Sequence, residues 1–249
     1  MTVHAVAEMT MDEFAELAKK TDVAIIPVGT LEAHGSHGPL GFDNYTAEEI
    51  ARRLASRIEA FLMPTVTYGC CKLVYDATNF PGTFSLSPET MSAFYSEIGK
   101  ELARQGVRRI LFTNGHVGNS PALMIAAYRI WSETGTAVGI LEHWVAAPEV
   151  RAKVFKRPGH AGESETSLLL ACEGAKHLKM DRAKVYLPED TASEKEVKGA
   201  GITSYTKVMA TPNYGDPHDA TKEKGEALIS VLVERGLAML ETLKTYVRT

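Results

Sequence analysis

The fold is decided by the stretch VAIIPVGTLEAHGSH, residues 23–37. Its first six residues form a short apolar run, which predicts a buried strand. Glu32, His34 and His37 follow in its second half. Residues two apart in an extended chain point to the same side, so Glu32 and His34 can address one point together. The stretch therefore predicts a strand that ends in a cluster of chemically active side chains.

Apolar strands and amphipathic helices alternate on both sides of this stretch. The sequence predicts helices at about residues 11–20, 47–58, 87–105, 120–132, 165–172 and 221–246, and strands at 23–28, 61–66, 108–113, 136–143 and 183–186. This alternation predicts an α/β fold, a three-layer α/β/α sandwich with a mainly parallel central sheet. The length allows one large domain or two small ones. No repeat or Pro/Gly/Ser-rich linker divides the chain, which favours a single domain over residues 1–249.

The composition excludes several classes of protein. Hydrophobic residues make up 45% and charged residues 23% of the 249 positions, as in a soluble globular protein. With 27 Lys and Arg against 31 Asp and Glu, and no dense basic stripe, we expect no nucleic-acid partner. The longest uncharged stretch, residues 110–128, contains Asn, Gly, His and Pro, so no membrane span is expected.

The cysteines and the first residues bear on the compartment. Three cysteines without metal-binding spacing suit the reducing cytoplasm, and Cys71 is expected to pack rather than to react. Residues 1–14 lack a basic segment followed by an apolar core, so no signal peptide is expected. The sequence therefore favours a cytoplasmic protein.

Polar side chains also follow the other predicted strands. Besides Glu32, His34 and Asp43, these segments carry Asn114, His116, Asn119, Trp144, His160, Glu163 and Glu165. The carboxyl ends of parallel strands share one edge of a sheet, where ligands bind, so we expect these residues to meet. Carboxylate and imidazole ligands without thiolate suit Zn, Mn or Fe. A carboxylate shared by two ions about 3.5 Å apart is a recurring hydrolytic device.

Taken alone, each of these residues also has a structural interpretation. Asp43 can be the N-cap of the helix that follows it, and Asn119 or Ser120 can cap the next one. Glu163 and Glu165 can lie at the positive amino end of their helix. Glu165, however, borders the apolar run LLLA, and its burial there would require a cationic partner. The clustering of all these residues at predicted strand ends favours a functional site.

Together, these motifs resemble the creatininase (creatinine amidohydrolase) family. The resemblance spans roughly residues 23–172 and rests on PVG (27–29), LEAHGSH (31–37) with Asp43, FPGT (80–83), NGH (114–116) with Asn119, HAG (160–162) and ETS (165–167). It implies an α/β/α sandwich, two divalent ions per subunit at the strand ends, a small-molecule substrate and a homohexamer.

The resemblance also implies a role for individual residues. Four residues match metal ligands of the family: Glu32, His34, Asp43 and His116. Asp43 matches the ligand that bridges both ions. His160 matches the histidine that handles protons during ring opening, and Trp144 matches a substrate-facing tryptophan. Asn114 and Val117, on either side of Gly115-His116, are further candidate substrate contacts.

Three positions depart from creatininase proper. Gly118 replaces a metal-binding Glu, and we expect Glu165 to serve as the substitute ligand and to take part in catalysis. Lys156 replaces a Trp that stacks on creatinine, and Gly159 replaces a Glu. Lys156, next to Arg157, would favour a hydroxylated or anionic substrate over a flat cationic ring. Creatinine is therefore not the expected substrate.

The sequence thus predicts a divalent-metal-dependent hydrolase that opens a cyclic amide or a related C–N bond with a metal-activated water. Two other activities within the same family remain alternatives: deformylation of a formamide, and hydrolytic C–C ring opening of a diketo-inositol. A binding module that keeps the metal without turnover is a further alternative, and Gly118 is the residue that favours it.

Overall fold

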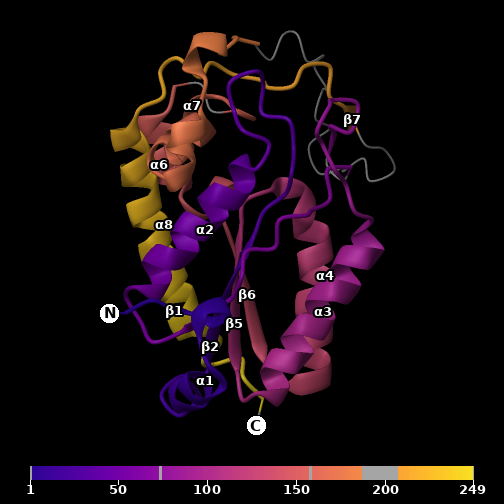
Figure 1. Ribbon diagram of the computed structural model, residues 1–249, viewed down its shortest axis with the longest axis vertical. Coiled ribbons are helices and arrows are strands. Elements are labelled where there is room, and N and C mark those ends of the chain that lie inside the picture. The colour runs from indigo at the N-terminus through magenta and orange to yellow at the C-terminus, as the bar shows by residue number, and fades with distance from the viewer. Residues whose placement is uncertain (1, 73–74, 157–158, 187–206, 249) are drawn as a thin grey trace.

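The computed structural model describes residues 2–72, 75–156, 159–186 and 207–248 (Figure 1). Its core is a five-stranded sheet in which every neighbouring pair is parallel. In spatial order, the strands are β1 (His4–Ala5), β3 (Phe61–Leu62), β2 (Val23–Val28), β5 (Arg109–Asn114) and β6 (Ala137–Glu142). The predicted parallel α/β sheet is confirmed.

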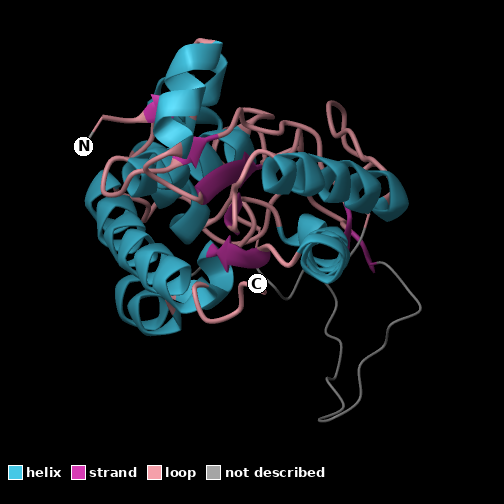
Figure 2. Cartoon of the chain, turned by 90° about the horizontal axis from the view of Figure 1, so that it is seen from below, coloured by secondary structure: helices cyan, strands magenta, loops and turns pink. Residues whose placement is uncertain are grey.

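Helices cover both faces of this sheet, as the predicted α/β/α sandwich requires (Figures 1 and 2). Ile25 of β2 joins a core cluster with α2 (Phe42–Ala55) and α8 (Lys222–Leu243). The next residue, Ile26, joins a second cluster with α3 (Pro88–Arg104) and α4 (Ser120–Thr134). Successive strand residues face opposite sides, so a continuous apolar strand supplies both cores. Helix α1 (Met11–Ala18) contributes Leu17 to the second cluster.

Local signals explain where several helices begin and end. The Ser87 side chain accepts a hydrogen bond from the backbone N–H of Thr90, and Pro88 occupies the first turn of α3. The Thr221 side chain caps α8 in the same way. Gly135 ends α4 with φ of 75°, a left-handed conformation that favours glycine.

Other boundaries differ from those predicted. Helix α2 begins at Phe42 rather than near residue 47, and its N-cap is Gly41, so the N-cap interpretation of Asp43 is wrong. Strand β3 ends at Leu62 rather than at residue 66, although Val66 still forms an isolated parallel bridge with Val28 of β2. Of the strand predicted at 183–186, only Tyr186 forms an isolated bridge, with Gly215.

Several short elements had no clear sequence signal. Strands β4 (Tyr75–Asp76) and β7 (Lys207–Val208) form a separate parallel pair. Helices α5 (His143–Ala146) and α6 (Pro148–Val154) follow β6, whereas α7 (Glu163–Leu170) confirms the helix predicted at residues 165–172. No helix within the described ranges combines the length and the apolar character that crossing a lipid bilayer requires.

The sheet order places a crevice at the carboxyl ends of two strands. The chain leaves β2 through α2 and returns as β3 on one side of β2, whereas β5 lies on the other side. In open parallel sheets, ligands bind where the strand order reverses in this way. The loops after β2 and β5 are therefore the expected position of the site.

Candidate metal centre

The loops after β2 and β5 bring together two carboxylates and two imidazoles. His34 Nε2 lies 3.1 Å from Asp43 Oδ1. His116 Nδ1 lies 3.0 Å from Glu32 Oε2 and 3.2 Å from Asp43 Oδ2. All four side chains are buried, with Glu32 fully inaccessible to solvent. The two oxygens of Asp43 thus face two different histidines.

A glycine allows the two loops to approach each other this closely. A Cβ on Gly115 would lie 2.3 Å from the carbonyl oxygen of Asp43. Any other residue at position 115 would therefore push the first turn of α2 away from the end of β5. The Gly of the NGH motif thus brings Asp43 close to His116.

Backbone carbonyls fix the tautomer of both histidines. His34 Nδ1 lies 3.0 Å from the carbonyl oxygen of Glu32, and His116 Nε2 lies 3.2 Å from that of Cys70. A carbonyl oxygen only accepts, so these two nitrogens carry the protons. In the neutral rings, the other nitrogens then direct their lone pairs at Asp43 and Glu32. Metal-binding histidines are held in the same way.

The buried carboxylates lack aligned hydrogen-bond donors. Both oxygens of Glu32, Oδ2 of Asp43 and Nε2 of His34 form no hydrogen bond among the described residues, although their neighbours are close. Uncompensated buried carboxylates are costly, and a cation removes that cost. A divalent ion with nitrogen and oxygen ligands fits this set of donors.

The electrostatics of the cluster agree with this fit. Burial alone would lower the pKa of His34, but Asp43 and Glu32 raise it to about 9. Burial likewise opposes ionisation of Asp43, yet His34 and His116 hold the pKa of that carboxyl below its usual range. The carboxylates are therefore ionised and create a negative potential that stabilises positive charge.

His160 and Glu165 lie next to this cluster. His160 Nε2 lies 2.9 Å from the carbonyl oxygen of Ala33, so this nitrogen donates, and Nδ1 lies 3.8 Å from Glu165 Oε2. Glu165 Oε2 accepts a hydrogen bond of 2.7 Å from the N–H of Ala161, whose φ of 49° is left-handed despite its side chain. Such strained backbone persists where the surroundings impose it, often at functional sites.

The described residues contain two groups of three side chains whose possible ligand atoms all lie within 4.8 Å of one another inside each group. One contains Glu32, His34 and His160, and the other contains Glu32, Cys71 and His116. Glu165 belongs to neither group. Cys71 had been expected only to pack, and its thiol contacts Thr30 Oγ1 at 3.2 Å.

A cavity of about 290 Å³ opens above the cluster. It is lined by Asp43, Gly115, His116, Val117, Trp144, Arg151, Gly159, His160, Glu165 and Tyr214. Val117 and Trp144 were expected as substrate contacts, and both lie in the wall. Arg151 and Tyr214 were not found from the sequence, because neither lies in a polar cluster directly after a strand.

Two expected substrate contacts lie elsewhere. Asn114 is buried below the cavity, where its amide oxygen accepts from the His116 N–H and its amide nitrogen donates to Glu142 Oε1. Lys156 is exposed, with Nζ 3.6 Å from Asp219 Oδ2. Neither residue lines the cavity. Arg157 lies outside the described residues.

Glu163 and Asn119 have structural partners. Lys224 Nζ lies 2.6 Å from Glu163 Oε1, which compensates the buried charge at the start of α7. Asn119 occupies the N-cap position of α4 but makes no side-chain capping bond, so the capping interpretation fails for Asn119. Its amide instead accepts from the Cys70 N–H and donates to the Gly29 carbonyl, which ties the strand-end loops together.

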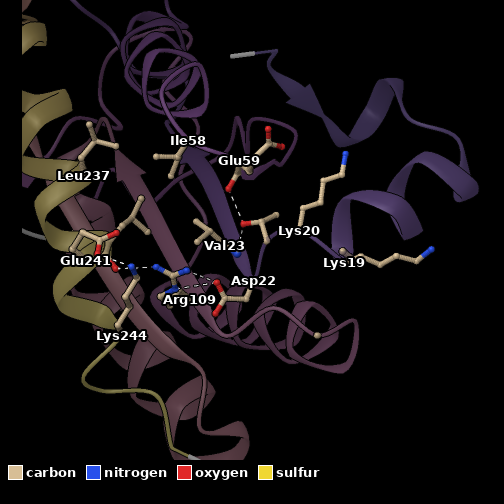
Figure 3. A pocket seen from close by; sticks show the side chains of 14 residues that line it. Lys19, Lys20, Asp22, Val23, Ile58, Glu59, Arg109, Leu237, Glu241 and Lys244 are labelled. Carbon is tan, nitrogen blue, oxygen red and sulfur yellow. Dashed lines mark hydrogen bonds and ion pairs between the residues drawn. The ribbon is translucent and has the colours of Figure 1, made fainter.

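A larger cavity of about 640 Å³ lies at the amino ends of the strands (Figure 3). Four of its charged side chains pair with one another: Arg109 with Asp22, and Lys244 with Glu241. No histidine lines it. Histidine and carboxylate side chains of the candidate metal centre border the smaller cavity instead.

The family model described as creatinine amidohydrolase matches residues 7–240. The chain belongs to the creatininase family. The creatinine amidohydrolase of Pseudomonas putida is 30% identical, over 92% of this chain and 93% of the relative. The mycofactocin precursor peptide peptidase of Mycobacterium tuberculosis is 28% identical over 93% and 90%. The 3-dehydro-scyllo-inosose hydrolase of Thermotoga maritima is 28% identical over 66% and 54%.

Solved structures of creatininases share the fold. A creatinine amidohydrolase matches over 100% of both chains with a TM-score of 0.82 and 28% identity. A manganese form matches over 98% and 99% with a TM-score of 0.81 and 30% identity, and one relative is described as a Zn-Zn type. The chain is accordingly a metal-dependent hydrolase of this family.

Replacement of Gly118 should disturb the centre rather than complete it. A Cβ here would lie 2.1 Å from the carbonyl oxygen of Cys70, which orients His116. We expect Gly118→Ala to lower the free energy of unfolding by about 1–3 kcal/mol and to lower the metal content. Urea unfolding and elemental analysis measure both effects. Gly41→Ala is the control, because its nearest contact is 3.4 Å away. Wild-type stability and metal content in Gly118→Ala would contradict this prediction.

Asp43→Ala should lose more metal than any other single ligand replacement, because each Asp43 oxygen faces a different histidine. Elemental analysis after dialysis provides the measurement. Asp43→Asn is the matched variant, since it keeps the size of the side chain and removes its charge. If either variant retains the wild-type metal content, Asp43 does not join two ions.

Proposed function

We propose that this hydrolase opens a cyclic amide or a related C–N bond and that creatinine is not its main substrate. The observation that carries the proposal is the pair of histidines facing opposite oxygens of Asp43, each anchored by a backbone carbonyl. This arrangement supports two ions per subunit, with zinc, manganese or iron as candidates.

Glu32, His34, Asp43 and His116 would hold the ions, and Glu165 would supply the carboxylate that Gly118 lacks. Bound there, divalent ions lower the pKa of a coordinated water and polarise the carbonyl under attack. The position of Glu165 in the cavity wall, with Oε2 3.8 Å from His160 Nδ1, supports its assignment.

His160 would carry the proton to the leaving nitrogen. Its Nε2–H bonds to the Ala33 carbonyl and holds the ring, while Nδ1 is directed toward Glu165. The Glu165 carboxylate stabilises the ring when Nδ1 takes up a proton. His160 then donates that proton as a general acid.

Two positions, Lys156 and Gly159, argue against creatinine as the main substrate. The exposed position of Lys156 provides no aromatic surface for stacking, an interaction worth about 1 kcal/mol. A Cβ on Gly159 would lie 2.1 Å from the carbonyl oxygen of Tyr214, so the Glu of creatininase proper has no room here. The pocket therefore differs from that of creatininase proper where the ring would bind.

The activity is tested by assaying the protein, loaded in turn with Zn, Mn and Fe, on lactams, formamides, cyclic polyol diketones and creatinine. We expect the lactams to be turned over and creatinine to react poorly. Preferred turnover of the diketones would favour C–C ring opening instead, the alternative that the Thermotoga relative raises. Efficient hydrolysis of creatinine would refute the proposed selectivity.

His160→Ala should keep the metal and lose roughly 10²–10⁴-fold in rate, the usual size of general acid–base catalysis. Glu165→Gln should lower both the metal content and the rate. Elemental analysis and single-turnover assays separate the two roles. If His160→Ala loses the metal while Glu165→Gln keeps it, the roles are exchanged, as the proximity of His160 to Glu32 and His34 would allow.

Three broader features belong to the same proposal. We propose one domain over residues 1–249, a homohexamer and a cytoplasmic location. The family match over residues 7–240 supports the single domain. Size-exclusion chromatography with light scattering tests the oligomeric state.

A further inference from the structure

Arg151 places a guanidinium in the wall of the candidate active-site cavity. It belongs to α6, which carries no predicted site residue. Its Nη2 donates to Ser164 Oγ at 3.2 Å, whereas Nη1 is buried and has no hydrogen-bond partner among the described residues. Burial lowers the pKa of Arg151 from its ordinary value, which reflects the cost of desolvating its charge. The guanidinium still stays protonated at neutral pH.

Other partly buried arginines in the described part of the chain have acidic partners. Arg53 pairs with Glu49 and Glu226, and Arg109 pairs with Asp22. Arg151 forms no ion pair within 4.0 Å with any described carboxylate. Glu165 affects it through the electrostatic field only. An unpaired guanidinium in a cavity is a ready site for an anion.

The shape of the group selects the kind of anion. A planar guanidinium matches a carboxylate through two parallel N–H···O bonds. A cavity of about 290 Å³ suits a small ligand, and Trp144 provides an aromatic wall.

We propose that Arg151 binds a carboxylate of the substrate, so that the substrate is a small amide carrying a free carboxylate. The carboxylate end lies at Arg151, and the bond to be cleaved lies at Asp43 and His116. The amide part of this statement rests on the proposed function, whereas carboxylate binding by Arg151 does not. Anion recognition, which the sequence suggested for Lys156, is thereby assigned to a residue inside the cavity.

Calorimetric titration of the manganese-loaded protein tests the proposal with two matched rings. 5-Oxoproline is a lactam with a carboxylate, and 2-pyrrolidinone is the same lactam without it. We expect the wild type to bind 5-oxoproline at least tenfold more tightly. Arg151→Gln should abolish this difference and keep the wild-type affinity for 2-pyrrolidinone. Arg151→Lys should keep part of this difference in affinity, because its ammonium group keeps the positive charge but cannot form the two parallel N–H···O bonds.

Lys153→Gln is the matched control, because it removes a positive charge from an exposed position of the same helix. It should bind both rings as the wild type does. A preference for 5-oxoproline that survives in Arg151→Gln would show that the metal ions hold the carboxylate, and would overturn the proposal. If Arg151→Gln binds neither ring, the proposal is also overturned. The same holds if the wild type binds the two rings equally well or binds neither of them.

A separate readout distinguishes this proposal from the proposed function. Hydrolysis of the same two rings is followed by the appearance of the free amine. If no amide is hydrolysed but the preference for 5-oxoproline depends on Arg151, amide hydrolysis fails and carboxylate binding stands. If lactams are hydrolysed equally well by Arg151→Gln and the wild type, with or without the carboxylate, the assignment of Arg151 fails and amide hydrolysis stands.

Discussion

Two carboxylates buried side by side, without a paired lysine or arginine among the described residues, determine how this end of the molecule is built. Glu32 is fully inaccessible and Asp43 nearly so, and the groups beside them are imidazoles whose outer nitrogens are held by backbone carbonyls. Ionised carboxylates at such depth need positive charge nearby. The strand order, the early start of α2 and the glycine at position 115 all bring them together at one place.

The sequence predicted most of this fold because apolar runs and helix caps act locally. Val23–Val28 and Ser87 led to the correct strand and the correct helix start. The first turn of α2 was missed because tertiary contacts decide it: Asp43 is drawn toward two histidines, and Gly41 supplies the N-cap position. Strand β3 was predicted too long because the backbone loses its regular register with β2 after Met63: Met63 and Val66 bond to Ile25 and Pro27, three residues against two, which the apolar pattern does not reveal.

The site was predictable where its residues follow strands, and not where they come from short helices. Glu32, His34 and His116 lie at strand ends, and a parallel sheet forces such residues to converge. Arg151 comes from the short helix α6, and Tyr214 follows the two-residue strand β7, so no periodicity marks either of them. Lys156 was expected in the pocket from its place in the motif. Its exposed ammonium group instead forms an ion pair with Asp219.

The histidines of this centre are oriented by the carbonyl oxygens of Glu32, Cys70 and Ala33, none of which depends on a side chain. The orientation of these three rings therefore depends on the path of the main chain. If the side chains of residues 33 and 70 change, their backbone carbonyls can still accept the same hydrogen bonds. Sequence identity at these positions therefore does not indicate how the rings are held. Relatives that diverge at such positions can still share one geometry, provided that the glycines that let the loops approach are kept.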